Sequence, residues 1–313
     1  MPKQKTPPAK VLSTYELIQM FPDEQSAIDY LAGILWPDGP VCPYCGKMRI
    51  SPRKEKNYYR CKDCRKDFTI RVGTIFHRSH IPLHKWMMAL YLIVTARKGI
   101  SSLQLSKEIR VKQESAWFLL QRIRAACGNQ VAVILSGIVE ADETYIGGLE
   151  KNKHANKKLN QGRGAVGKIP VHGIRGRDGQ VVAQVVQSTD ASTLQGIIKA
   201  NVLPGTTVCT DEHKSYDGLD AVFTHKRVNH SAKQYVDGMA HTNGIESFWA
   251  VLKRGFYGTY HWFSREHLSR YVNEFVFRLN EGNCKYDTVD RLEALVRGVK
   301  GKRLTWKMLM QGL

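Results

Sequence analysis

The sequence has no apolar stretch long enough to cross a bilayer and no apolar segment among its first residues. Its longest apolar stretch, residues 86–96, is followed at once by Arg97 and Lys98, whereas a membrane-spanning helix needs about 20 apolar residues. Residues 2–10 are rich in Pro and Lys, which is typical of a flexible basic tail and not of an export signal. We therefore predict a cytoplasmic protein without a membrane partner, and we interpret residues 86–96 as a core helix.

Acidic residues are scarce relative to basic ones. The 313 residues include 28 Asp and Glu against 47 Lys and Arg, which gives a formal net charge of +19. A surplus of this size favours a polyanionic partner, and nucleic acid is the leading candidate. An anionic membrane surface would require a basic amphipathic helix or a lipidation signal, and the sequence has neither. The length predicts about two domains with an appendage.

Cysteines are also few, but four of the seven form two CxxC pairs with fifteen residues between them. These four residues are Cys42, Cys45, Cys61 and Cys64. Zn²⁺ prefers a tetrahedron of thiolates, and the intervening residues suit a short hairpin that returns the second pair to the first. A disulfide or a redox CxxC is the alternative, but the other three cysteines are scattered singly and no export signal precedes them. The spacing therefore predicts a zinc ribbon.

The regions on either side of the four cysteines have helical patterns. Apolar positions in residues 13–39 predict two short helices, and residues 42–71 interleave basic and aromatic side chains, which favours contact with nucleic acid over a merely solvated face. Three further helices are predicted over 83–97, 101–109 and 113–127. Their spacing suits a helix-turn-helix, with Lys112 and Gln113 near base edges at the start of the third helix. A small helical bundle that links two domains is the alternative.

From Gly137 the composition becomes that of a mixed α/β layer. Strands are predicted over 138–145, 171–175, 181–186 and 207–210. A hairpin turn over 176–179 and a helix over 190–200 connect the later strands, so the sheet mixes antiparallel and crossover connections. Residues 150–168 form a basic loop expected to bind something acidic. Two long helices over 243–254 and 265–280 follow, and a basic tail comes after them.

Acidic residues stand where these strands would present them to a ligand. Alternation in the first strand puts Glu140 and Asp142 on one face and Glu143 on the other. The last apolar strand ends directly before Asp211, at the edge where open α/β sheets present ligand groups. Glu246 begins a helix that can lie across the sheet. We therefore select Asp142, Asp211 and Glu246 as the candidate catalytic acids.

Converging carboxylates cannot all remain ionised without a cation. Mg²⁺ or Mn²⁺ would supply it and leave coordination sites open for phosphate oxygens and water. Two such ions about 4 Å apart can activate an attacking hydroxyl and stabilise the departing 3′ oxygen of a phosphoryl displacement. Lys253 lies two helical turns after Glu246 on the same face, and we expect it and Arg254 to bind DNA phosphate.

Each acid also has a purely structural interpretation. Asp142 and Asp211 could be turn acids satisfied by backbone amides, and Glu246 could close a capping box with Asn243. Rival acids stand beside the selected ones, namely Glu140, Glu143, Glu212 and Asp217. The histidines have no ligand-like spacing, and we interpret them as polar or DNA-facing: His213, His225, His230 and His241. Spacing alone does not decide between these interpretations.

Three motifs carry a family resemblance, EADETYIGG at 140–148, TDEHKSY at 210–216 and HTNGIESFW at 241–249. With the zinc ribbon and the helical segment, they resemble bacterial insertion-sequence transposases that contain a ribonuclease-H-like DDE domain, over residues 21–280. By position, the resemblance implies that Asp142 and Asp211 are the two aspartates of that domain, Glu246 its third acid and Lys253 the basic residue that follows. It also implies cleavage at terminal inverted repeats, joining of the 3′ hydroxyls to target DNA, and a homo-oligomer on paired ends.

The combined prediction is an α/β protein with a ribonuclease-H-like mixed sheet and helices, preceded by a zinc ribbon and a helix-turn-helix-like segment. The expected domains are a flexible basic tail (1–12), N-terminal helices (13–39), the zinc ribbon (40–80), the helical DNA-binding segment (81–130), the catalytic domain (131–285) and a basic C-terminal tail (286–313). The expected function is a DNA transposase with structural Zn²⁺ and catalytic Mg²⁺ or Mn²⁺. A domesticated, inactive DNA-binding relative and a structure-selective nuclease are the alternatives.

Overall fold

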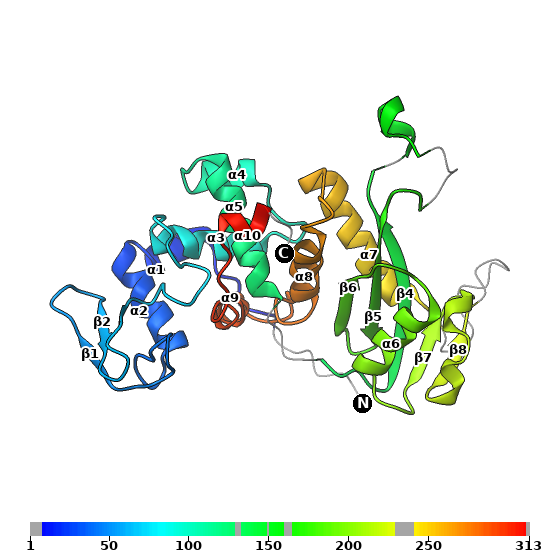
Figure 1. Cartoon of the computed structure of the whole chain (residues 1–313), viewed down its shortest axis with the longest axis horizontal. Coiled ribbons are helices and arrows are strands. Elements are labelled where there is room, and N and C mark those ends of the chain that lie inside the picture. The colour runs from blue at the N-terminus through cyan, green and yellow to red at the C-terminus, as the bar shows by residue number, and fades with distance from the viewer. Residues whose placement is uncertain (1–7, 129–132, 149, 160–164, 229–240, 311–313) are drawn as a thin grey trace. The chain divides into compact units, whose positions relative to one another are not determined.

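The computed structural model describes residues 8–128, 133–148, 150–159, 165–228 and 241–310. The chain divides into two compact units (Figure 1). The first unit comprises Met1–Asn129 and Glu281–Leu313, and the second comprises Gln130–Asn280. Within the described ranges, no helix is long and apolar enough to cross a membrane.

The first unit begins with two short helices, α1 (Thr14–Met20) and α2 (Glu24–Leu35). Each starts at a capping box, with Ser13 bonded to Glu16 and Asp23 bonded to Ser26, which satisfies backbone N–H groups that a helix start leaves unpaired. The ribbon follows as an antiparallel sheet of β1 (Ile50–Pro52), β2 (Tyr59–Cys61) and β3 (Asp67–Phe68). These elements lie where the sequence analysis expects them.

Three helices come next, α3 (Leu83–Thr95), α4 (Ser102–Glu108) and α5 (Gln113–Cys127). The apolar segment predicted as a core helix is the largely buried α3. Ser101 caps α4 by accepting a hydrogen bond from the Gln104 N–H at 3.1 Å. Arg110 adopts a left-handed φ of 51°, which turns the chain sharply between α4 and α5. The result is two short-linked helices with the start of α5 exposed.

The C-terminal residues differ from the expected basic tail. They form α9 (Thr288–Arg297) and α10 (Trp306–Met310), and they belong to the first unit. Arg122 on α5 is buried and donates to the carbonyls of Ile75 and Leu304, both at 3.0 Å. The backbone N–H of Lys10, expected in the N-terminal tail, donates to the Asp287 carboxylate, and its carbonyl accepts the N–H of Thr288 at the start of α9. Apolar residues such as Leu292 and Leu295 fix these segments, although basic residues surround them in the sequence.

The second unit is built on a five-stranded sheet in the order β6-β5-β4-β7-β8. Its strands are β4 (Ile138–Ile146), β5 (Ile169–Gly176), β6 (Val181–Val185), β7 (Thr207–Thr210) and β8 (Thr224–Arg227). The first three form an antiparallel meander, whereas β7 and β8 run parallel to β4. The short strand β8 was not predicted, because residues 224–227 (THKR) are polar and largely exposed.

Helices cover both faces of this sheet (Figure 1). On one face, α7 (Asn243–Gly255) and α8 (Leu268–Leu279) bury a core that includes Val171, Phe248 and Phe275. On the other face, α6 (Ala191–Asn201) packs its Leu194 and Ile198 against the sheet. Short 3-10 turns at 150–152 and 155–157 lie in the predicted basic loop. This arrangement confirms the predicted mixed α/β, ribonuclease-H-like fold.

Gly173 on β5 allows α7 to lie close to the sheet. It pairs directly with Asp142 on β4, and a Cβ atom at this position would lie 2.6 Å from the Trp249 ring of α7. Contacts below 3.0 Å require the neighbouring group to move, and the bulky indole is buried in the core. The absence of a side chain at Gly173 therefore sets the position of Trp249.

We expect Gly173→Ala to destabilise the protein by about 1–3 kcal/mol, because the added methyl group overpacks the contact between the sheet and α7. Gly196→Ala in α6 is the matched control, since nothing lies within 4 Å of its added Cβ. Alanine is the better helix former, so the control should gain about 0.5–1 kcal/mol. Urea unfolding of both variants checks this, and equal stability changes would contradict the packing argument.

Candidate functional site

The four predicted cysteines lie together in the ribbon. Their sulfur atoms all lie within 4.8 Å of one another, with Cys42 and Cys64 at 3.6 Å and Cys45 and Cys61 at 3.6 Å. A disulfide would bring two sulfurs to about 2.05 Å. Tetrahedral zinc with bonds of about 2.3 Å separates its sulfurs by about 3.8 Å. The spacing therefore suits a metal ion and excludes the disulfide alternative in this conformation.

The two CxxC turns have the same backbone geometry. The N–H of Gly46 donates to the Cys42 carbonyl at 2.9 Å, and the N–H of Arg65 donates to the Cys61 carbonyl at 3.0 Å. Both donors have a left-handed φ, 72° and 57° respectively. Backbone N–H groups of Cys64 and Asp63 lower the pKa of Cys61 to about 7, which favours the thiolate that zinc binds, whereas burial and hydrogen bonds with the other thiols raise the pKa of Cys45 to about 12. This donor set fits a structural zinc ion.

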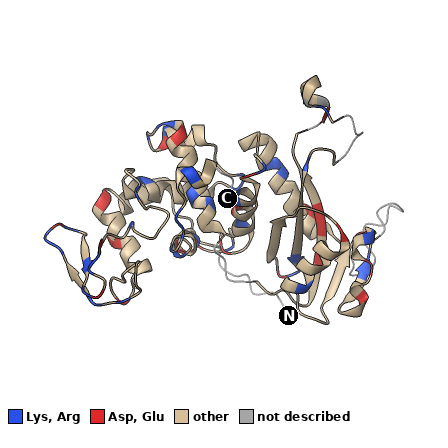
Figure 2. Cartoon of the chain, viewed as in Figure 1, with Lys and Arg blue, Asp and Glu red and all other residues tan. Residues whose placement is uncertain are grey.

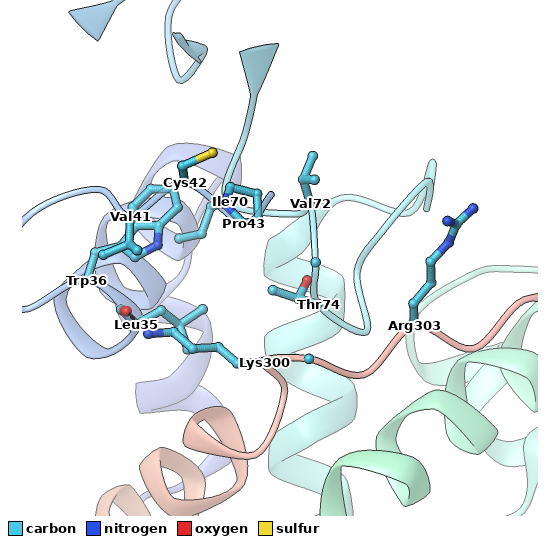
Figure 3. A pocket seen from close by; sticks show the side chains of 12 residues that line it. Leu35, Trp36, Val41, Cys42, Pro43, Ile70, Val72, Thr74, Lys300 and Arg303 are labelled. Atoms are coloured by element: carbon cyan, nitrogen blue, oxygen red, sulfur yellow. Dashed lines mark hydrogen bonds between the residues drawn. The ribbon is translucent and has the colours of Figure 1, made fainter. Parts of the chain in front are cut away.

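A partly apolar pocket of about 270 Å³ lies beside the first CxxC turn of the ribbon (Figure 3). Leu35, Trp36 and Pro43 line it together with Lys300 and Arg303 from the C-terminal segment. The ammonium group of Lys300 donates to the Leu35 carbonyl. The C-terminal segment therefore completes the support of the ribbon, which explains why it folds with the first unit.

The predicted DNA-contacting residues of the first unit are exposed. Lys112 is the N-cap of α5, Gln113 is its first residue, and both side chains face solvent. The amide of Gln113 donates to the Ser102 hydroxyl at 3.4 Å, which links the starts of α4 and α5. A helix start with exposed polar side chains is able to approach base edges.

In the second unit, the structure brings Asp142 and Asp211 together. Asp142 lies on β4, Asp211 directly follows the neighbouring parallel strand β7, and Figure 2 shows acidic segments on the central strands. Burial, followed by the charges of Glu143 and Asp211, raises the pKa of Asp142 from 3.8 to about 7. The indole N–H of Trp249 donates to Asp142 Oδ2 at 2.9 Å. Two repelling carboxylates at one sheet edge are suited to a hard divalent cation such as Mg²⁺ or Mn²⁺.

The rival acid Glu140 has a structural role. Its carboxylate is only 2% exposed, accepts the N–H of Ile245 at 2.8 Å and lies 3.2 Å from the Arg177 guanidinium. His241 Nδ1 is 3.3 Å from the same carboxylate. Glu140 therefore satisfies a backbone N–H at the start of α7, where a negative charge is favourable. Gly244 permits this approach, because a Cβ there would lie 2.6 Å from Glu140 Oε2.

The rival acid Glu143 lies on the opposite face of β4. Its side chain is 7% exposed, and Oε2 accepts a hydrogen bond from the Tyr216 hydroxyl at 2.6 Å. Burial raises the pKa of Glu143, and the charge of Asp211 adds to this effect. Glu143 is therefore a close neighbour of the aspartate pair, although it belongs to the other face of the sheet.

Glu246 lies in the first turn of α7 with an exposed side chain, one turn before Trp249. Its Oε1 accepts a hydrogen bond from the Thr242 hydroxyl at 2.8 Å. The capping box with Asn243 does not form, because the N-cap of α7 is Thr242, one residue earlier, and the sheet residue Glu140 accepts the Ile245 N–H. Among the described residues, the cysteines are the one group of three or more metal-binding side chains with donor atoms within 4.8 Å. Glu246 therefore does not form a closed cluster with the two aspartates in this conformation.

Lys253 and Arg254 are exposed in the last turn of α7 (Figure 2). Lys253 lies two turns beyond Glu246 on the same side of the helix. Cations at this position also stabilise the C-terminal end of a helix. Both side chains remain accessible to a phosphate group.

The remaining polar candidates take varied positions. Glu212 and Asp217 are exposed, and Asp217 pairs with Arg227 at 2.8 Å. His225 is almost fully buried and its Nε2 lies 2.9 Å from the Thr210 hydroxyl. His230 lies outside the described residues.

Sequence reasoning did not identify Trp249 or Tyr216 as parts of the site. Both appear within the quoted motifs, yet each reaches an acid on β4 that is distant in sequence. An aromatic residue at helical spacing is usually a core residue, and both residues are indeed buried. The signal that could have found them was their polar atom, since a buried indole N–H or phenol usually has a hydrogen-bond partner.

Comparisons with known protein families agree with this architecture. Residues 134–280 match the family described as "ISXO2-like transposase domain", and residues 22–67 match "Transposase zinc-ribbon domain". The chain is 31% identical over 276 residues to the "Uncharacterized protein in transposable element ISH50" of Halobacterium salinarum, a match that covers 83% of this chain and 92% of the relative. An "Uncharacterized transposase-like protein" of Haemophilus influenzae is 34% identical over 120 residues, covering 38% of this chain and 95% of that one.

Solved structures with weak similarity include two Mos1 transposase complexes. The paired-end complex with the left transposon end has 13% identity and a TM-score of 0.28, and covers 72% of this chain and 76% of the other. The pre-cleavage Mos1 transpososome has 12% identity and a TM-score of 0.26, and covers 92% and 97% of the two chains.

We expect the purified protein to contain about one zinc ion per chain and Cys61→Ser to lose it, because one thiolate is removed from the tetrahedron. Cys284→Ser is the matched control, since Cys284 is an exposed cysteine of the same unit outside the quartet. Elemental analysis of the reduced proteins measures the zinc content. Absence of zinc from the wild type, or its retention in Cys61→Ser, would contradict the assignment.

We also expect Asp142→Asn to stabilise the protein when no divalent cation is added. The pKa of Asp142 is raised on folding, so ionisation of this group destabilises the folded state, beginning above pH 3.8 and reaching its full effect above about pH 7. The gain in Tm should therefore be larger at pH 8 than at pH 5, and calorimetry at both values measures it. A gain independent of pH would show that the carboxyl group is not destabilised by ionisation.

Proposed function

Since the chain belongs to the ISXO2-like transposase family, we propose that it is the DNA transposase of an insertion sequence. It would bind terminal inverted repeats, cleave the DNA in a metal-dependent reaction and transfer the 3′ ends to target DNA. The observation that carries this proposal is that Asp142 on β4 lies near Asp211, which directly follows the parallel strand β7, so that their charges repel. We infer that the reaction takes place in the cytoplasm.

Asp142, Asp211 and Glu246 are the proposed ligands of the catalytic Mg²⁺ or Mn²⁺ ions. Two aspartates come from adjacent strands, and Glu246 stands on the helix that Trp249 links to Asp142. Glu246 is exposed and its Oε1 accepts a hydrogen bond from the Thr242 hydroxyl, and we propose that its side chain rotates toward the pair when the ions bind. When bound, the ions would activate the attacking oxygen and stabilise the departing one.

The remaining residues of the second unit hold this arrangement and attract DNA. The Trp249 N–H fixes the orientation of the Asp142 carboxylate, in the manner of an outer-shell partner of a metal ligand. Glu140 fixes the start of α7, and with it the position of Trp249 four residues later. Lys253 and Arg254 would bind phosphates beside the acids and offset the repulsion between DNA and the carboxylates.

Recognition of the element's end is assigned to the first unit. The zinc-held ribbon interleaves basic and aromatic side chains, and Lys66 lies 4.8 Å from the ring centre of Tyr44. Lys112 and Gln113 are proposed to contact DNA from the start of α5. Since two ends must be processed together, we propose that the protein acts as a homo-oligomer. DNA binding should weaken steeply with salt, because the contacts to phosphate release counterions.

We expect Asp142→Asn and Asp211→Asn to abolish cleavage of a duplex that carries the terminal repeat, while gel-shift affinity for this duplex is retained. Each variant removes a proposed metal ligand and leaves the basic surfaces intact. Asp217→Asn is the matched control, because it removes an exposed acid of the same loop that pairs with Arg227. Cleavage is measured on labelled DNA with Mg²⁺ or Mn²⁺.

Cleavage by either aspartate variant at the wild-type rate would contradict the assignment. A wild-type protein that binds the repeat but never cleaves it would instead support a domesticated DNA-binding relative. Cleavage without strand joining would support a nuclease. These outcomes separate the proposed transposase from both alternatives.

A further inference from the structure

The backbone does not fix the separation of the two aspartates. The parallel pairing of β4 with β7 includes Ile138 with Thr207, Val139 with Val208 and Glu140 with Cys209. Asp142 and Asp211 each come two residues after the last of these pairs. The Thr210 carbonyl is bonded instead to Val228, beyond β8. Strand pairing therefore ends before the positions at which the carboxylates repel each other.

A side-chain bridge spans the two segments beyond the end of this ladder. Glu143 follows Asp142 on β4, and Tyr216 lies in the turn that follows Asp211. The Tyr216 hydroxyl donates to Glu143 Oε2 at 2.6 Å, and the tyrosine is 0% exposed. A short hydrogen bond to a carboxylate, shielded from water, is among the stronger side-chain contacts in proteins.

The segment that carries Tyr216 is held rigidly to its surroundings. The amide group of Gln195 on α6 donates to the carbonyls of Ser215 and Asp217 at 3.0 and 2.8 Å. The Ser215 hydroxyl donates to the Thr189 carbonyl at 2.6 Å. Within the turn, the His213 N–H donates to Asp211 Oδ1 at 3.0 Å. The Tyr216 bridge therefore connects β4 to a fixed turn that also orients Asp211.

His172 closes the buried side of the bridge. It pairs with Glu143 across β4 and β5, and its ring centre lies 6.4 Å from that of Tyr216. The ring is 0% exposed, and neither of its nitrogens has a hydrogen-bond partner among the residues that the structure describes. Tyr216 thus faces a buried ring on one side and has Glu143 as the acceptor for its hydroxyl.

We infer that Tyr216 and Glu143 form a positioning pair that holds Asp142 and Asp211 at the separation a divalent cation requires. Glu143 acts through its hydrogen bond and does not ligate the cation itself, because Oε2 is bonded to Tyr216 and the side chain lies on the face of β4 opposite to Asp142. The pair resists the mutual repulsion of the aspartates before the cation binds. This inference rests on the proposed function, since it assigns the aspartates to a metal site.

The test measures the affinity of the purified, zinc-containing chain for Mn²⁺ by electron paramagnetic resonance. We expect Tyr216→Phe to weaken Mn²⁺ binding about tenfold or more, the usual effect of losing an outer-shell partner of a metal site. Tyr260→Phe is the matched control in the same unit, because it removes a 2.8 Å hydrogen bond between a tyrosine and the buried Glu274. The control should leave the affinity unchanged, and calorimetry verifies that both variants fold.

Two substitutions of Glu143 separate positioning from direct ligation. Glu143→Gln retains an oxygen that accepts from Tyr216, so it should bind Mn²⁺ more tightly than Glu143→Leu, which retains none. Equal loss in both variants would show that Glu143 is itself a ligand and would overturn the inference. Unchanged affinity in Tyr216→Phe would overturn it as well.

A separate comparison, between the wild type and Asp142→Asn, tests the metal site on which the proposed function depends. If the wild type binds Mn²⁺ and Asp142→Asn does not, the metal site stands whatever Tyr216→Phe does. If Asp142→Asn binds Mn²⁺ as the wild type does, or the wild type binds none, the metal site and the positioning inference fall together.

Discussion

The repulsion between two carboxylates at the edge of one sheet is the constraint around which the second unit is built. Asp142 stands on β4 and Asp211 directly follows the parallel neighbouring strand β7, and burial together with nearby negative charge raises the pKa of Asp142 to about 7. A fold gains nothing in stability from such an arrangement, since a buried ionised carboxylate is costly without a partner. Side chains with strongly shifted pKa values are concentrated at functional sites, where a bound cation or substrate offsets the repulsion between like charges. In the proposed transposase, a divalent cation bound by both carboxylates would offset this repulsion.

The acids of β4 show how position within one strand assigns different roles to similar side chains. Glu140 is enclosed by Arg177 and the start of α7, so it serves the helix. Asp142, on the same face, accepts a hydrogen bond from the indole N–H of Trp249 and is repelled by the charge of Asp211, which suits it to bind a cation. Glu143 points to the opposite face and bonds Tyr216. Three acids within four consecutive residues of one strand thereby connect to the start of α7, to Trp249 and to the turn after β7.

Much of this organisation was predictable from local patterns. The CxxC spacing predicted the sulfur cluster, and alternation with a terminal aspartate predicted the pairing of Asp142 and Asp211. The roles of Trp249, Tyr216 and Glu140 depend on contacts between segments that are distant in the sequence. The periodicity of apolar residues within one segment does not reveal such contacts. The Asn243 capping box did not form for the same reason, since Thr242 is the N-cap and a carboxylate from the distant strand β4 accepts the Ile245 N–H. The C-terminal helices α9 and α10 were not predicted, because the basic composition of this segment is also typical of a tail and the helical spacing of its apolar residues was overlooked.

The central claim is that Asp142 and Asp211 bind one divalent cation between them. Crystals soaked in Mn²⁺ and measured at the manganese absorption edge test it directly. The account predicts an anomalous peak within coordination distance, about 2.0–2.2 Å, of carboxylate oxygens from both residues. Manganese bound elsewhere in the second unit, with none between these two side chains, would contradict it.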